Sequence, residues 1–140
     1  MSISAFTPAD ALRKALGAAM LADPALDSVL GAGRVHDAVP DRLRPPYVVV
    51  GRTTSADWST ATENGEAVTL FLHVWTRQER RDENHAAQAA IRAIAEGPLT
   101  LPGHHLVALR HELSETRRDA QTGHVHGVLR FRAIIEPNDD

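Results

Sequence analysis

Residues 66–76 alternate between aliphatic and mixed side chains, and this pattern constrains the fold more than any other in the sequence. Every second position is aliphatic: Val68, Leu70, Leu72 and Val74. The positions between them are polar or aromatic: Thr69, Phe71, His73 and Trp75. Because successive side chains of a β-strand point to opposite faces, the alternation predicts a strand with one fully apolar face and one mixed face. The chain must therefore supply a second apolar layer to cover that strand.

A helix is predicted from Thr7 to about Ala22. Thr7 is a suitable cap, and Pro8 in the first turn loses no hydrogen bond because the amides there have no partner within the helix. One face of this segment is apolar at helical spacing: Leu12, Leu16, Ala19 and Met20. The helix is therefore expected to lie on an apolar surface. Asp23-Pro24 then begins a further short helical turn.

A second, longer helix is predicted between two boundary motifs. Thr76 followed by Glu79 has the spacing of a capping box, and Gly97-Pro98 is a typical helix end. The residues between them form an apolar stripe: Ala87, Ala90, Ile91 and Ile94. Because the stripe occupies one side, this helix is also expected to pack on the sheet.

Four other segments have the composition of strands: 34–39, 47–54, 105–115 and 125–136. Asn64-Gly65 is a good hairpin turn, and Thr122-Gly123 is expected to close a second hairpin. The polar segments 55–65 and 116–124 form the hairpin connections. This order predicts an α+β fold: a two-layer sandwich of an antiparallel four- to five-stranded sheet with two helices packed on one face.

Size and composition exclude several classes of protein. With 140 residues, 43% of them hydrophobic, the chain has apolar surface for one core. We therefore expect residues 1–137 to form a single domain and residues 138–140 a short disordered tail. The lack of cysteine excludes disulfides and thiolate chemistry. The sequence shows neither a signal peptide nor a membrane-spanning run, so a cytoplasmic location and no membrane association are expected.

Histidines are the strongest candidates for a reactive site. His124 and His126 would lie on one face of a strand, which is half of a metal site. His111 and the pair His104-His105 are further potential ligands. The sequence identifies no third ligand and contains no H-E-x-x-H motif, so the pattern favours solvated or structural histidines. A histidine-dependent metal hydrolase is the alternative, which elemental analysis of purified protein would test.

Nucleophile and phosphate-binding motifs are also missing. No serine lies in a G-x-S-x-G turn, and Gly31 and Gly33 precede a strand instead of joining a strand to a helix. We therefore assign no catalytic residue, no cofactor and no metal ligand.

Trp58 is the leading candidate for an interface, because it lies in the polar segment 55–65 without an obvious apolar partner. A tryptophan in this setting either anchors a protein interface or folds back over its own sheet, and the sequence leaves both alternatives open. The other candidate interface residues are charged and lie in or near the two hairpin connections: Arg52, Asp57, Glu63, Arg117 and Arg118.

Several segments, in order along the chain, resemble the family of small tail completion (tail terminator) proteins of long-tailed phages and gene transfer agents. They are Ala11-Leu12-Arg13-Lys14-Ala15-Leu16, Gly33-Arg34-Val35-His36-Asp37-Ala38-Val39-Pro40, Pro46-Tyr47-Val48, Asp57-Trp58-Ser59-Thr60, Leu72-His73-Val74-Trp75-Thr76-Arg77 and His126-Gly127-Val128-Leu129-Arg130-Phe131-Arg132. Together they span nearly the whole chain. Within the family, the sequence is most similar to versions from gene transfer agent clusters and related prophages.

The resemblance implies a structural protein of the particle that has no enzymatic activity. Family members form a ring, commonly a hexamer, which stops growth of the tail tube and joins it to the head-side connector or stopper protein. The family fold is a sheet with two helices against one face. A ring needs a rigid subunit with two different sides, and the polar segments 55–65 and 116–123 are expected to contact neighbouring subunits, the tube or the connector. A generic oligomeric binding module is a further alternative, which light scattering separates from a ring by mass.

The resemblance also implies that DNA passes through the channel of the ring. The chain carries 15 basic and 18 acidic residues, a net charge of −3, which differs from the basic excess of a dedicated nucleic-acid-binding protein. We therefore expect DNA to pass without specific binding. A cluster of arginines lining the channel would count against the expectation that the duplex slides through without being bound tightly.

Overall fold

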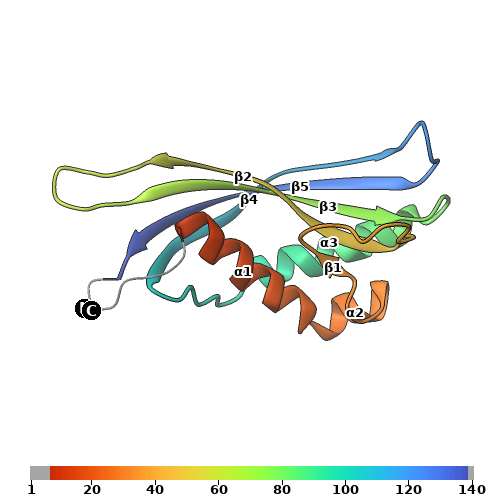
Figure 1. The fold of residues 1–140 in the computed structure, drawn as a ribbon, viewed down its shortest axis with the longest axis horizontal. Coiled ribbons are helices and arrows are strands. Elements are labelled where there is room, and N and C mark those ends of the chain that lie inside the picture. Colours follow the sequence, from red (N-terminus) through yellow and green to blue (C-terminus); the bar gives the residue numbers. More distant parts are fainter. Residues whose placement is uncertain (1–6, 139–140) are drawn as a thin grey trace.

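The alternating strand forms the middle of a five-stranded sheet, and helices cover one of its two faces (Figure 1). The computed structural model describes residues 7–138. Its elements are, in order, α1 (Pro8–Leu21), α2 (Pro24–Leu30), β1 (Val35–His36), β2 (Tyr47–Asp57), β3 (Glu66–Thr76), α3 (Arg81–Glu96), β4 (His104–Arg118) and β5 (Val125–Pro137). The predicted α+β sandwich is confirmed, with the short turn of helix after Asp23-Pro24 present as α2. None of the helices in the described part of the chain is long and apolar enough to cross a membrane.

The strands follow the order β1-β2-β3-β5-β4 across the sheet. The four long strands are antiparallel to their neighbours. The two-residue β1 instead runs parallel to β2, pairing Val35 with Val48 and His36 with Val49. The proline-containing connection 37–46 carries the chain back so that β2 starts beside β1 in the same direction.

One apolar core lies between the sheet and the helices. The side chains of Val68, Leu70, Leu72 and Val74 are 0% exposed, which confirms the predicted orientation of β3. They meet buried residues of α1 and α3, which include Leu12, Leu16, Met20, Ala87 and Ile91. Burial of these residues provides the main driving force for folding, because each large aliphatic side chain removed from water contributes about 1.5 to 3 kcal/mol.

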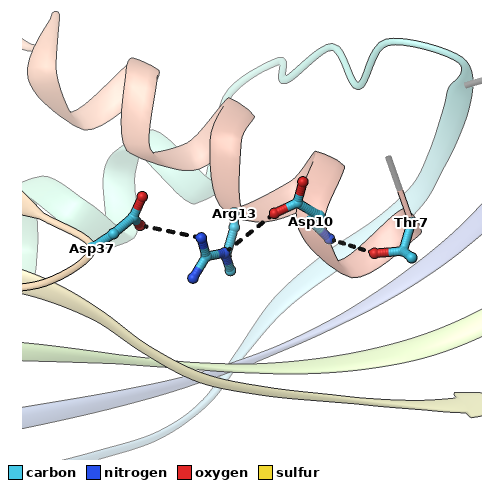
Figure 2. Close-up of polar contacts among 4 residues, drawn as sticks. All are labelled: Thr7, Asp10, Arg13 and Asp37. Atoms are coloured by element: carbon cyan, nitrogen blue, oxygen red, sulfur yellow. Dashed lines mark hydrogen bonds and ion pairs between the residues drawn. The ribbon is translucent and has the colours of Figure 1, made fainter. Parts of the chain in front are cut away.

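The start of α1 agrees with the sequence prediction. The Asp10 amide donates to Thr7 Oγ1 at 3.2 Å, and Pro8 occupies the first turn. Arg13 then lies between two carboxylates, with Nε 3.7 Å from Asp10 and Nη2 3.6 Å from Asp37 (Figure 2). The pair with Asp10 lies within α1, and the pair with Asp37 links α1 to the segment that follows β1.

The predicted capping box at the start of α3 is wrong. Thr76 is the last residue of β3, fully buried and paired with Val125 of β5. Its Oγ1 donates to the carbonyl oxygen of Arg80 at 2.9 Å instead of capping the helix. The helix begins at Arg81 without a side-chain cap, because the ladder between β3 and β5 holds Thr76 in the sheet.

A buried polar cluster joins α3 to three strands. Asn84 Nδ2 donates to the carbonyl oxygens of Val74 and Val125 at 2.9 and 3.2 Å. Gln88 Nε2 donates to Asn84 Oδ1 at 2.7 Å and to Thr116 Oγ1 at 2.8 Å. Because these groups lie at i and i+4 within the apolar face of α3, they fix the helix on the sheet by hydrogen bonds as well as by packing.

Replacing Gly127 by alanine is expected to destabilise the protein by about 1 to 3 kcal/mol, because α3 leaves no room for a side chain there. A Cβ at Gly127 would collide with Asn84 Oδ1 and lie 2.5 Å from Gln88 Nε2. Urea unfolding measures the effect. Gly17→Ala in α1 is the matched control: nothing lies within 4 Å of its added Cβ, so it should be neutral or stabilising. Equal effects of both substitutions would contradict the assigned crowding.

Both hairpins have longer strands than predicted. β2 continues to Asp57 and β4 to Arg118, so the connections are residues 58–65 and 119–124. In the second turn, the Thr122 hydroxyl and amide donate to an Asp119 carboxylate oxygen at 2.8 and 3.0 Å, and these bonds lower the pKa of Asp119. Gly123 adopts a φ of 78°, as the predicted turn requires.

The expected disordered tail comprises residues 138–140, of which residues 139–140 lie outside the described residues. The backbone amide of Asn138 donates to the Gly103 carbonyl oxygen at 3.2 Å.

Candidate assembly surfaces

The candidate interface residues lie at separate places on the sheet and form no single site. Asp57, Trp58 and Glu63 belong to the β2–β3 hairpin, at the left end of Figure 1. Arg117 and Arg118 lie where β4 ends, next to the turn at the opposite end of the sheet. The molecule therefore presents two different ends, and the β2–β3 hairpin extends beyond the helices (Figure 1).

Trp58 is presented by a loop that is held by its own hydrogen bonds. The Asp57 carboxylate accepts from the Ser59 hydroxyl at 2.6 Å, and that hydroxyl oxygen accepts from the Gly65 amide at 3.2 Å. The Trp58 amide donates to the Gly65 carbonyl at 2.9 Å, and the Glu63 amide donates to Thr60 Oγ1 at 3.0 Å. Trp58 is 49% exposed, so its ring is only partly covered by its own chain.

The arginine candidates occupy three different surroundings. Arg117 forms an exposed ion pair with Glu115, with 3.8 Å between Nε and the carboxylate. Arg118 lies beside the turn, with Nη2 3.3 Å from where a Cβ on Gly123 would be. Arg52 points to the face without helices, where its guanidinium carbon lies 4.9 Å from the centre of the Phe71 ring.

The face of the sheet without helices carries a stack of three rings. The rings of Trp75 and His126 lie 4.0 Å apart at an angle of 4°. His73 continues the stack, and its Nδ1 is 2.9 Å from Nε2 of His126. We call this side of the sheet, which carries Phe71, His73 and Trp75 of β3, the uncovered face.

The structure groups the histidines differently from the sequence pattern. His126 contacts His73 of β3 and not His124. In the register of β3 and β5, Trp75 lies opposite His126 and His73 lies opposite Val128, so His73 and His126 are diagonal neighbours on the same face. His111 instead bonds Ser114 at 2.6 Å. A single sequence does not give strand register, so this pairing was missed. Within residues 7–138, no group of three or more His, Asp or Glu side chains is placed to hold a metal ion.

The histidine pair favours its uncharged form. The pKa of His73 is lowered because partial burial disfavours the charged ring. The pKa of His126 is lowered for the same reason, and the neighbouring His73 and Arg117 lower it further. Asp119 and Glu115 act in the opposite direction but with smaller effect. The hydrogen bond between the two rings also requires an unprotonated nitrogen on at least one of them.

Acidification below pH ~6.5 is expected to destabilise the fold through this pair. Histidine in the unfolded chain titrates near pH 6.5, so it takes up protons there before the folded pair does. The stability that the uncharged pair contributes is fully present above pH ~6.5 and is lost as the pH falls toward the lower pKa of the folded pair. Urea unfolding at about pH 7.5 and about pH 5.5 measures the loss.

His126→Phe separates this effect from other acid effects. Phenylalanine keeps a ring against Trp75 but does not titrate, so the loss of stability between the two pH values should be smaller than in the wild type. His85→Phe is the control, because His85 is exposed on α3. An unchanged pH dependence in His126→Phe would refute the assignment.

Comparison with known proteins identifies the kind of molecule that has this fold and these hairpins. The family model for tail completion protein gp17 matches residues 14–136, which covers most of the chain. The chain belongs to the tail completion protein gp17 family. Among curated relatives, it is 29% identical over 93 residues to tail completion protein gp17 of Bacillus phage SPP1, across 66% of this chain and 69% of that protein.

A solved structure extends the family match to the whole fold. The chain is similar to a protein chain in the virion of a native gene transfer agent particle, with a TM-score of 0.84 and 30% identity. The match covers 94% of this chain and 99% of that chain. The predicted tail completion family and its structural role in particle assembly are confirmed. Proteins of this family are structural tail proteins and components of a particle made of many subunits.

Proposed function

We propose that this protein forms a ring, with six copies as the expected number, that terminates a tail tube and joins it to the head-side connector or stopper protein. The similarity over nearly the full length to a chain of the gene transfer agent virion carries this proposal. In this role the protein is not an enzyme and uses no cofactor. It is assembled in the cytoplasm, becomes part of the particle tail, and has no role at a membrane.

The shape of the subunit supports a closed ring. A head-to-tail interface closes only when each subunit turns the next by a fixed angle, so the subunit must be rigid and its two sides must differ. The ladders between the long strands and the hydrogen bonds of Asn84 and Gln88 provide rigidity. The hairpins at opposite ends of the sheet provide two different contact surfaces (Figure 1). We treat residues 1–137 as the single domain that forms the subunit.

The two hairpins are the proposed contact regions. Asp57, Trp58 and Glu63 form one of them, in which Trp58 is the anchor and the hydrogen bonds of the loop limit the entropy lost on binding. Arg117 and Arg118 form the second, whereas Arg52 lies on the uncovered face, outside both regions. DNA is proposed to pass through the channel of the ring without sequence-specific binding.

Deletion of the coding sequence from a cell that produces the particle tests the proposal. We expect tail tubes of irregular, excess length that are not joined to heads, because nothing stops their growth or offers the joining surface. Supplying the wild-type protein from a second copy should restore uniform joined tails. Normal tail length and normal joining without the protein would overturn the proposed function.

A further inference from the structure

Four arginines, of which Arg130 is partly buried and the others are exposed, form a row across the uncovered face of the sheet. Arg110 of β4 lies directly opposite Arg132 of β5, and Arg130 lies two residues further along β5 on the same face. Phe71 of β3 pairs with Arg130, and the Arg52 guanidinium of β2 lies over the Phe71 ring. The row therefore crosses four neighbouring strands, and the helices lie on the opposite side of the sheet (Figure 1).

Within residues 7–138, part of this positive charge has no acidic partner. Arg130 Nε lies 3.2 Å from Glu112, so that arginine is paired. Among the described residues, no ion pair is formed by Arg110 or Arg132, and both are exposed. Like charges directly opposite each other on a sheet destabilise it. An anion bound between Arg110 and Arg132 would remove this cost.

The spacing of the row fits a polymer of phosphates. Strands are about 4.8 Å apart, so four strands extend over roughly 15 Å. Duplex DNA carries one charge per about 1.7 Å of its axis, which places several phosphates over the row. The guanidinium group has a planar set of donors that matches phosphate oxygens. A flat sheet face does not enter a groove, so this surface can contact the backbone and not the base edges.

We propose that the uncovered face binds the phosphate backbone of duplex DNA, independently of base sequence, through Arg52, Arg110, Arg130 and Arg132. The source of the DNA rests on the proposed function, in which the duplex passes through the ring. Such binding departs from the expectation that the duplex slides through without being bound tightly. The net charge of −3 averages both layers of the molecule. In α3 the acidic residues Asp82 and Glu83 lie beside the basic residues Arg81 and Arg92, whereas at the centre of the uncovered face four arginines surround one carboxylate, Glu112.

Binding of a fluorescent duplex, followed by anisotropy as salt is increased, tests the proposal on the full chain. The wild type should bind duplexes of different sequence equally, with an affinity that falls linearly on a log–log plot against salt. The double variant Arg110→Gln and Arg132→Gln should bind more weakly and lower the slope by about two, one for each lost phosphate contact. Absence of binding by the wild type at low salt would overturn the proposal.

The matched control is the double variant Arg81→Gln and Arg92→Gln, which removes the same charge from exposed positions of α3. It should keep the wild-type salt slope. Equal losses in the two double variants would show that only net charge matters, and would also overturn the proposal.

Measurement of assembly on the same samples separates this proposal from the ring function. Both double variants should form the same oligomer as the wild type, as judged by light scattering. If the Arg110 and Arg132 variant alone fails to assemble, the face is a contact between subunits, and the DNA proposal fails while the ring stands. If the wild type binds DNA but shows no ring with or without tubes, the ring proposal fails instead.

Discussion

Replacing Leu72 by alanine is expected to lower the free energy of unfolding by about 2 to 5 kcal/mol. Leu72 is 0% exposed and lies in the centre of β3, between Val50 of β2 and Leu129 of β5. Truncation removes buried methyl groups and leaves a cavity, because close-packed strands and helices relax only partly. Chemical denaturation followed by circular dichroism measures the change.

Leu113→Ala provides the matched control for this core substitution. Leu113 is also on a long strand, but its side chain is 44% exposed on β4. Its truncation should change the stability of the isolated subunit by no more than about 0.5 kcal/mol. A small effect at Leu72 together with a large effect at Leu113 would mean that the two faces of the sheet are assigned the wrong way round.

Replacing Trp58 by alanine is expected to leave the subunit folded and to weaken its assembly by about 2 kcal/mol or more, which is roughly 30-fold. Trp58 is 49% exposed, directly follows β2 in the β2–β3 connection, and is not part of the hydrophobic core. Large aromatic side chains of this kind supply much of the binding energy of an interface when a partner buries them. Light scattering over a range of concentrations, with and without tail tubes, measures the loss.

Leu21→Ala is the control for Trp58→Ala. Leu21 is an apolar residue of α1 with a similar exposed fraction, 45%, but it lies outside the hairpins. It should assemble like the wild type. Normal assembly of Trp58→Ala, or unfolding of that variant, would show that Trp58 is not an interface anchor.

The sequence is sufficient to predict the helices and long strands and to predict which face of the sheet is buried. The alternation in β3 depends only on local geometry, so it predicts the orientation of Leu72 and Val74 correctly without any tertiary contact. The error at Thr76 has the opposite cause. Its spacing to Glu79 is typical of a helix cap, but pairing with Val125, a distant residue, keeps Thr76 in the sheet.

The arrangement of the surfaces depended on contacts that a single sequence does not contain. The order β3-β5-β4 places His126 beside His73, from strands that are separated along the chain by α3 and β4, and the register of the β4–β5 hairpin places Arg132 beside Arg110. The need for glycine at position 127 is likewise evident only from the tertiary structure, because Asn84 of α3 packs against it. The interface role assigned to Trp58 remains a prediction, because burial in a partner is a property of the assembly and not of one subunit.

Electron microscopy of the purified protein mixed with its tail tubes decides whether the protein terminates them. We expect a ring of identical subunits seated on one end of each tube, and tubes that grow no further at that end. Tubes with bare ends that continue to grow, beside protein that remains as single copies, would contradict this terminating role.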